Sequence, residues 1–178
     1  MVLASVFTIL LFICLTHSQT PSSTPNSAVP HSSVKAMWSE GNALSNDALY
    51  GVVKDSLGNF VYIGIYTSNG SLSFIPSSSY NGGTDCFLVK YSSTGVVLWA
   101  VPFGGFSTDT VRGIATDASD NLYITGSTSS PTVFWNLNNA TSPSSAKPTS
   151  GIDFMVAKYD SSGNFQWGYV NGSNGQDT

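Results

Sequence analysis

Carboxylates are the side chains of this sequence whose number and spacing could support catalysis. The chain has ten Asp and Glu residues. Seven recur at matching positions of an internal repeat: Asp47, Asp109 and Asp177; Asp55 and Asp117; Asp85 and Asp153. Acid–base cleavage of a glycosidic bond needs two carboxyl groups with different pKa values at one place. Carboxylates that recur in each repeat are better explained as turn residues that accept backbone N–H bonds. We therefore predict no catalytic residue.

Histidine and cysteine are too few in the repeats for nucleophilic or zinc chemistry. Both histidines, His17 and His31, precede the repeats, which excludes a Ser-His-Asp, Cys-His or histidine-ligated zinc site there. Cys86 lies in the apolar run DCFLVKY, so we expect it to pack rather than react. The DSLGN and DSSGN turns lack the alternating oxygen ligands of an EF-hand loop, so calcium is a weak alternative there. We predict no cofactor and no metal.

Two lysines and three tryptophans also recur. Lys90 and Lys158 each end an apolar run beside a tyrosine. We expect each stem to lie along a neighbouring sheet and its ammonium group to pair with a repeat aspartate, with an anion site as the alternative. Trp38, Trp99 and Trp167 could stack on carbohydrate, but packing between sheets is favoured.

The composition indicates a packed domain that does not bind nucleic acid. Of the 178 residues, 41% are hydrophobic and 12% aromatic, which favours a folded core over disorder. Only 9% are charged, against about 25% in average proteins, and the formal net charge is -4. Such a surface lacks the basic patch that nucleic-acid binding requires.

The N-terminus has the pattern of a secretory signal peptide. Its uncharged apolar run, residues 2–15, is shorter than the ~20 residues that a membrane-spanning helix needs. Thr16 and Ser18 then place small residues where a signal peptidase requires them. We assign residues 1–18 to a signal peptide, with a buried core helix as the alternative, and residues 19–33 to a Ser/Thr/Pro-rich linker. The protein is predicted to be secreted or on the cell surface, without a transmembrane segment.

The rest of the chain, residues 34–178, repeats itself. The three tryptophans are 61 and 68 residues apart, and the first set of aspartates 62 and 68 apart. The units span approximately residues 39–100 and 101–168, and a third is truncated. The stretches after Thr67 and Thr128 vary between units. A period of this length predicts a solenoid, an array or a propeller.

Each unit is predicted to form two β-hairpins. RGIATDASDNLYITGST and FMVAKYDSSGNFQWGYV each place a turn of Asp, Ser and Asn between two apolar runs. No helical periodicity occurs in the repeats. CFLV and FMVA are apolar at every position, so we expect these strands to be covered on both faces. Sheets stacked face to face as propeller blades meet this requirement, and a β-solenoid is the alternative.

These units resemble the SBBP β-propeller repeat. The matching residues are Asp109, Gly113, Ala115, Asp117, Asn121, Tyr123, Thr125, Gly126, Thr128, Asp153, Phe154, Lys158, Tyr159, Gly163 and Trp167. The resemblance implies a multi-bladed propeller, commonly extracellular, usually without an assigned activity. We expect an all-β incomplete propeller of about two blades plus edge strands, each blade with four antiparallel strands.

The aligned units define six pairs of structural repeat positions. They are Asp55/Asp117, Asn59/Asn121, Tyr62/Tyr123, Asp85/Asp153, Lys90/Lys158 and Trp99/Trp167. Two departures from the repeat pattern lead to expectations of their own. Asp120 replaces the usual turn glycine, which is expected to loosen the turn. The first unit is aligned with an extra residue near Phe60, which places Ile65 opposite Gly126 and indicates a bulge.

A propeller needs at least four blades, so further repeats are expected in the natural gene product. Two repeats alone would expose unpaired strand edges and an apolar blade face. We therefore expect the isolated chain to aggregate or oligomerise, with the Met37–Trp38 strand poorly anchored. The predicted function is a non-catalytic binding or display scaffold with an unknown protein or glycan ligand. The alternative is part of a glycan-active hydrolase or lyase whose site is assembled from several blades.

Export and glycosylation give the first testable prediction. Three N-x-S/T sequons, at Asn69, Asn139 and Asn171, fall in two variable stretches and a predicted turn, where sugars can be attached in a secreted protein. In a eukaryotic secretory host, the chain should lose its first 18 residues and gain glycans at some of these sites. Intact mass spectrometry measures both changes, and an unprocessed, unglycosylated chain would contradict the prediction.

Overall fold

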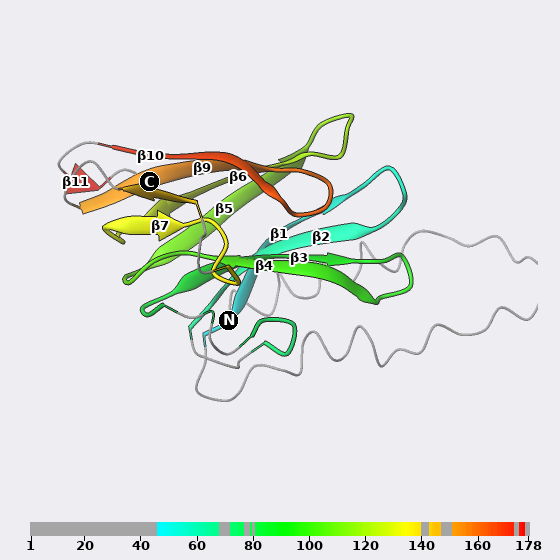
Figure 1. The fold of residues 1–178 in the computed structure, drawn as a ribbon, viewed down its shortest axis with the longest axis horizontal. Helices are drawn as coiled ribbons and strands as arrows, with labels where there is room; N and C mark the ends of the chain where they lie inside the picture. Colours follow the sequence, from blue (N-terminus) through cyan, green and yellow to red (C-terminus); the bar gives the residue numbers. More distant parts are fainter. Residues whose placement is uncertain are drawn as a thin grey trace, which may run out of the picture.

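The computed structural model describes residues 46–67, 72–76, 79, 81–139, 143–146, 151–172 and 175–176. Within these residues the regular structure consists of β-strands (Figure 1). The strands are β1 (Ala48–Lys54), β2 (Phe60–Tyr66), β3 (Asp85–Tyr91), β4 (Val97–Phe103), β5 (Asp109–Thr116), β6 (Leu122–Thr128), β7 (Thr132–Phe134), β8 (Ser144–Ala146), β9 (Gly151–Tyr159), β10 (Phe165–Asn171) and β11 (Gly175–Gln176). The part described contains no helix long and apolar enough to cross a bilayer.

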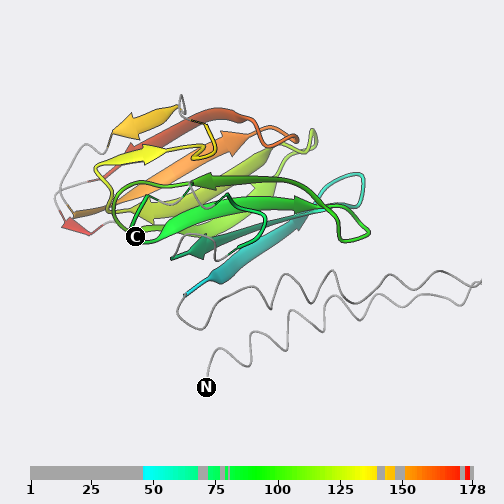
Figure 2. The same ribbon diagram turned by 60° about the horizontal axis from the view of Figure 1, so that its bottom comes forward.

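The strands form two antiparallel four-stranded sheets that lie face to face. The first sheet has the order β1-β2-β3-β4 and the second β5-β6-β9-β10, with β11 added beside β9. A small hairpin of β7 and β8 is inserted between β6 and β9. Figures 1 and 2 show the second sheet stacked on the first. The predicted all-β class, with four antiparallel strands per unit, is confirmed.

The strand register corrects the alignment of the two units. Phe60 pairs with Tyr91 in the first sheet, and Leu122 pairs with Tyr159 in the second. Phe60 and Leu122 are therefore equivalent, and no extra residue lies beside Phe60. It follows that Val61, and not Tyr62, corresponds to Tyr123. Because side chains alternate along a strand, the predicted one-residue shift would have moved each side chain of β2 to the opposite face of the sheet.

The expected bulge lies in the first strand of each sheet instead. The register shifts between Leu49 and Gly51 in β1, and the equivalent shift occurs in β5. Gly64 and Gly126 are equivalent and face these strands. A Cβ on Gly64 would collide with the carbonyl oxygen of Ala48, and one on Gly126 with that of Thr110. The close approach of backbone explains why both units have glycine here.

The main core lies between the two sheets. Its fully or nearly fully buried members are Val61, Ile63, Cys86, Leu88, Val101, Phe103, Val111, Leu122, Ile124, Val133, Trp135, Met155, Ala157 and Tyr159. Trp135, in the inserted segment, is the largest of these buried side chains. Its ring stacks on that of Phe165 with centroids 5.6 Å apart, and its carbonyl accepts a hydrogen bond from the Tyr159 hydroxyl at 2.8 Å. The insertion therefore completes the core.

The opposite face of the first sheet is covered by a segment of its own unit. Leu72, Phe74 and Ile75, from the stretch between β2 and β3, pack with Phe87 and Tyr91 of that face. β3 is consequently buried at all seven positions, as expected. The same expectation is wrong for β9, because no described strand covers its other face. Phe154 of β9 is 43% exposed.

The buried indole of Trp135 leads to a stability prediction. Trp135→Ala should lower the free energy of unfolding by about 3–5 kcal/mol, because it leaves a cavity between the sheets. Urea denaturation monitored by far-UV circular dichroism measures the change. Leu57→Ala is the control, since this side chain is 80% exposed and its removal should change stability by less than about 0.5 kcal/mol. Equal effects of the two substitutions would show that the insertion is not part of the core.

Candidate functional site

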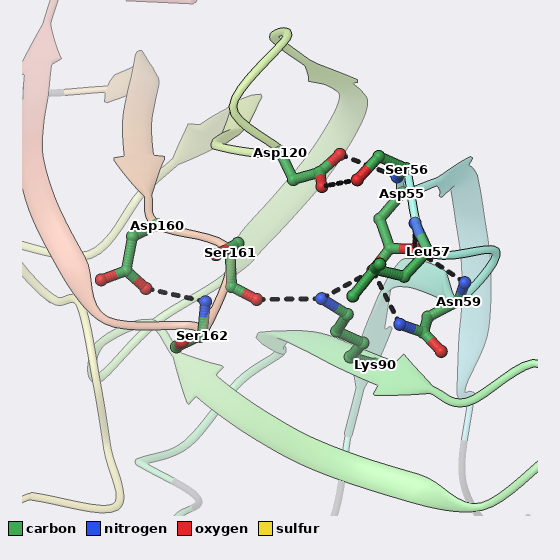
Figure 3. A network of polar contacts seen from close by, with 9 residues as sticks. All are labelled: Asp55, Ser56, Leu57, Asn59, Lys90, Asp120, Asp160, Ser161 and Ser162. Atoms are coloured by element: carbon green, nitrogen blue, oxygen red, sulfur yellow. Dashed lines mark hydrogen bonds and ion pairs between the residues drawn. The ribbon is translucent and has the colours of Figure 1, made fainter.

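A polar network joins the hairpin turns at one end of the two sheets (Figure 3). Lys90, near the end of β3, lies at its centre. Its ammonium group donates to Asp55 Oδ2 at 2.9 Å, in the turn between β1 and β2, and to the Ser161 carbonyl at 3.0 Å, in the turn between β9 and β10. The Lys90 side chain is only 9% exposed. One buried lysine thus links a turn of its own sheet to a turn of the next.

The Asp-x-x-Gly/Asp-Asn sequence builds each turn of this network. In the first turn, Asp55 Oδ1 accepts the backbone N–H groups of Leu57 at 3.0 Å and Asn59 at 2.7 Å, while the Asn59 amide donates to Oδ2 at 2.9 Å. Asp117 and Asp160 make the equivalent bonds in their turns. The aspartates therefore act as turn residues, with their lone pairs occupied by local donors.

Hydrogen bonding sets the ionisation of these turn aspartates. Burial acts to raise the pKa of Asp55, but the bonds from Lys90 and Asn59 outweigh it and hold the pKa at about 2. The bond from Asn121 is the largest influence on Asp117, and the pKa of that carboxyl is also lowered to about 2. Both groups are carboxylates at neutral pH, which suits an ion pair and not a general acid.

The aspartate that replaces the turn glycine makes a contact between the sheets. Asp120 has a positive φ of 59°, close to the 84° of its equivalent Gly58, and Asp is among the residues that tolerate this region. The turn is not loosened: the Asp117 N–H donates to the Asn121 carbonyl at 3.1 Å, as the first turn does at 2.9 Å. The Asp120 carboxylate accepts bonds from the Ser56 N–H at 2.9 Å and hydroxyl at 2.6 Å.

Trp99 completes this contact between the sheets. Lys90 lies 6.0 Å from its ring, on the side where β3 and β4 face the second sheet. A Cβ on Gly163, in the turn that supplies Ser161, would lie 3.0 Å from the indole. Gly163 also has a φ of +82°, so it meets two demands at once, a left-handed turn and a tight fit against the tryptophan.

In the second sheet, no described sheet packs against the equivalent lysine and tryptophan. Lys158, equivalent to Lys90, is 4.0 Å from Asp117 Oδ2, and its side chain is 23% exposed. Its ammonium group lies 5.1 Å from the ring centre of Tyr123, whose hydrogen bond raises the pKa of the lysine. Trp167, equivalent to Trp99, packs beside Tyr123 with centroids 6.2 Å apart. Lys158 and Trp167 are therefore both partly exposed to solvent.

We call this surface the outer face of the second sheet; it carries Tyr123, Phe154, Lys158, Trp167 and Tyr169. Phe154 is 43%, Trp167 37% and Tyr169 64% exposed. Their equivalents in the first sheet are Cys86, Trp99 and Val101, which contribute to the core between the sheets. Equivalent positions therefore differ in exposure because, among the residues described, another sheet packs on this face of the first sheet and none packs on this face of the second.

Two further repeat aspartates meet at the other end of the sheets. Asp85 begins β3 and Asp109 begins β5, and both are 0% exposed. Each has an Oδ1 atom that is buried and has no hydrogen-bond partner. Burial raises the pKa of Asp85 to about 8 and that of Asp109 to about 6. Sequence reasoning placed these residues in separate turns and missed their contact, because they belong to different units. Asp153, the equivalent of Asp85, is also wholly buried.

The predicted glycosylation sequons lie in different structural environments. Asn139 is exposed just after a turn, as expected for a glycosylation site. Asn171 is exposed but is the last residue of β10 rather than part of a turn. It is equivalent to Phe103, which is wholly buried between the sheets. Asn69, Trp38 and Asp177 lie outside the described residues. Among those that the structure describes, no group of three His, Cys, Asp or Glu side chains could hold a metal ion.

Part of the chain is similar to known proteins. Residues 103–134, from the end of β4 to β7, match the model of the SBBP β-propeller repeat. The two antiparallel four-stranded sheets are consistent with blades of an incomplete β-propeller. An uncharacterised WD repeat-containing protein, L264 of Acanthamoeba polyphaga mimivirus, is 28% identical over 109 residues, which is 61% of this chain and 8% of that protein. The chain therefore spans a small part of this relative, and what they share is a repeat scaffold.

The difference between Lys90 and Lys158 gives a matched pair of substitutions. Lys90→Met should lower the free energy of unfolding by about 3 kcal/mol or more, because it leaves the buried Asp55 carboxylate without its cation. Lys158→Met should have a much smaller effect, since both that lysine and its aspartate are partly exposed to solvent. Urea denaturation at neutral pH measures both. Equal losses of unfolding free energy would contradict the prediction, because they would show that burial of Lys90 against Ser161 adds nothing to stability.

Proposed function

We propose that the chain is a secreted or cell-surface, non-catalytic scaffold that binds through the outer face of its second sheet. The observation that carries the proposal is the exposure of Phe154, Trp167 and Tyr169 on a face whose equivalent in the first sheet is buried. Isolated apolar side chains on a surface are ordinary, but a contiguous aromatic patch marks an interaction site. The N-terminal sequence, with its signal-peptide pattern, supports the location.

The partner that fits this face is a further four-stranded unit of the same repeat type. The first sheet shows what such a unit must supply: a main-chain carbonyl for the lysine, as Ser161 supplies to Lys90, and a glycine for the tryptophan, as Gly163 supplies to Trp99. An Asp-Ser-x-Gly-Asn turn provides both. Lys158 and Trp167 stand in the same relative positions for a unit on the second sheet.

The backbone at the boundary of the second sheet supports this partner. In the first sheet, Thr84 forms a parallel bridge with Thr108, and β5 of the next unit follows directly. In the second sheet, Ile152 forms the equivalent parallel pair with Gln176 of β11. The first sheet's opposite face is already covered by residues 72–75, so stacking can proceed in one direction.

A glycan at Asn171 would compete with this partner. Asn171 takes the position of Phe103, so its side chain stands on the outer face of the second sheet, opposite Phe154. A branched sugar there is too bulky to fit between two sheets packed about 10 Å apart. Asn139 is not part of this face. We therefore propose that Asn139 is the glycosylated site of these two when the outer face is occupied.

An extended chain tests the proposed partner. Appending a copy of residues 111–176 after Thr178 creates a third unit that begins, as the second does, with Asp-Thr. If the unit docks on the outer face, Lys158→Met should become as destabilising in the extended chain as Lys90→Met is in the natural one. The measurement is the free energy of unfolding, and the control is the same substitution in the natural chain.

Two results would contradict the proposal. If Lys158→Met has the same small effect in both chains, the third unit folds without docking. If a glycan array detects binding to the natural chain that Trp167→Ala abolishes, the outer face is a carbohydrate site and not a stacking surface. Turnover of any glycan by the pure protein would overturn the non-catalytic role.

A further inference from the structure

We propose that Asp85 and Asp109 hold one proton between them, as a carboxylic acid hydrogen-bonded to a carboxylate, and that this proton fastens the first sheet to the second. The inference concerns the junction of the two units and does not depend on what binds the outer face. The pair lies at the end of the sheets opposite to Lys90, where β4 of the first sheet leads into β5 of the second.

Gly104 shows how closely the two carboxyl groups approach. It follows β4 and has a φ of +152°. A Cβ placed on it would collide with Asp85 Oδ1 and lie 3.1 Å from Asp109 Oδ2. The two carboxyl groups, from different sheets, therefore both lie next to Gly104. A residue with a side chain cannot occupy this position without separating them.

The donors around the pair are neutral: besides the bonds that follow, the Thr128 hydroxyl acts to lower the pKa of Asp109, and the Gly105 N–H that of Asp85. Asp109 Oδ2 accepts the Gly105 N–H at 2.7 Å and the Ser130 hydroxyl at 2.8 Å. Asp85 Oδ2 accepts the Asn81 N–H at 2.8 Å. Asp85 Oδ1 and Asp109 Oδ1 are buried and have no partner. No ion pair involves either residue in the described part of the chain.

Two unpaired negative charges in such a site are costly, and a single proton removes the conflict. Burial disfavours ionisation, and a second carboxylate nearby disfavours it further. One proton neutralises one group and supplies one O–H donor, which can satisfy the free oxygen atom of the other. Such a pair takes up and releases its protons in two steps that belong to both groups.

The neighbouring titratable group supplies no charge to the pair. Cys86 follows Asp85 in β3 and faces the core, and burial raises the pKa of its thiol, with the charges of Asp109 and Asp85 adding to the effect. The thiol therefore stays neutral across the physiological range. Backbone groups also bond across the junction: the Asp109 N–H donates to the Thr84 carbonyl at 2.7 Å. Loss of the shared proton would leave two carboxylates that repel each other beside this bond.

The direction of the pH dependence follows from the raised pKa values. Both groups hold their protons more tightly in the folded chain than in the unfolded one, where an aspartate has a pKa of about 3.9. Between that value and about 8, the folded state binds more protons, so stability falls as the pH rises through this window. The turn aspartates, with lowered pKa values, act in the opposite direction and only below pH of about 4.

Urea unfolding of the full chain between pH 5 and pH 9 tests the shared proton. From pH 6 to pH 8.5, the unfolding equilibrium constant of the unaltered protein should rise about tenfold or more. Asp85→Asn should reduce this rise to less than about threefold, because the amide carries no titrating proton and can donate to Asp109. Asp117→Asn is the control: it removes an exposed turn carboxylate and should leave the rise unchanged.

Infrared spectroscopy supplies a measurement that does not depend on how well the variants fold. The unaltered protein at pH 7 should show the C=O stretch of a protonated carboxylic acid, and this band should disappear by pH 9. Absence of the band, or an unaltered pH dependence in Asp85→Asn, would overturn the proposal. So would stabilisation of the unaltered protein by calcium chloride at pH 7 that Asp85→Asn abolishes, because the pair would then be a cation site.

Discussion

Each four-stranded sheet has apolar side chains on both of its faces, and the need to cover both faces determines the rest of the structure. The first sheet meets this need on one face with residues 72–75 and on the other with the second sheet. Within the described residues, the second sheet meets it on one face only, where Trp135 of the inserted hairpin fills the space that the strands leave. The variable insertions are therefore the elements that adapt a common sheet to its particular neighbours.

Polar contacts fix how one sheet sits on the other, because apolar packing alone has little directionality. At one end Lys90 reaches from its own sheet's turn to a carbonyl of the next sheet, and Asp120 reaches back to Ser56. At the other end Asp85 and Asp109 meet across the junction. Buried polar groups of this kind demand partners in set positions. They restrict both the distance and the angle between successive units.

Much of this fold is visible in the sequence because its signals are local. The Asp-x-x-Gly/Asp-Asn turns, the apolar runs and the period of the repeat identify the hairpins, and the recurrence of Asp55 and Asp117 indicates a structural role for these carboxylates. The alignment of β2 with β6 could not be predicted in this way. Tyr62 and Tyr123 are the same residue type and invite alignment, but they lie on opposite faces of their sheets. The burial of Trp135 and the meeting of Asp85 with Asp109 were missed for a related reason: both arise from contacts between units.

Equivalent residues also show why a repeat pattern alone does not determine environment. Lys90 and Lys158 each pair with an equivalent tryptophan and lie beside the same type of turn aspartate, yet the first is buried and the second is partly exposed. Their units differ at the residue paired with the lysine, which is Val61 in the first sheet and Tyr123 in the second, but neither residue buries its lysine between two sheets. The difference comes from the Ser161 carbonyl and Gly163, which belong to the following unit. In the described part of the chain, the lysine therefore has its complete set of contacts where the second sheet packs on the first, and no described sheet lies against the outer face of the second.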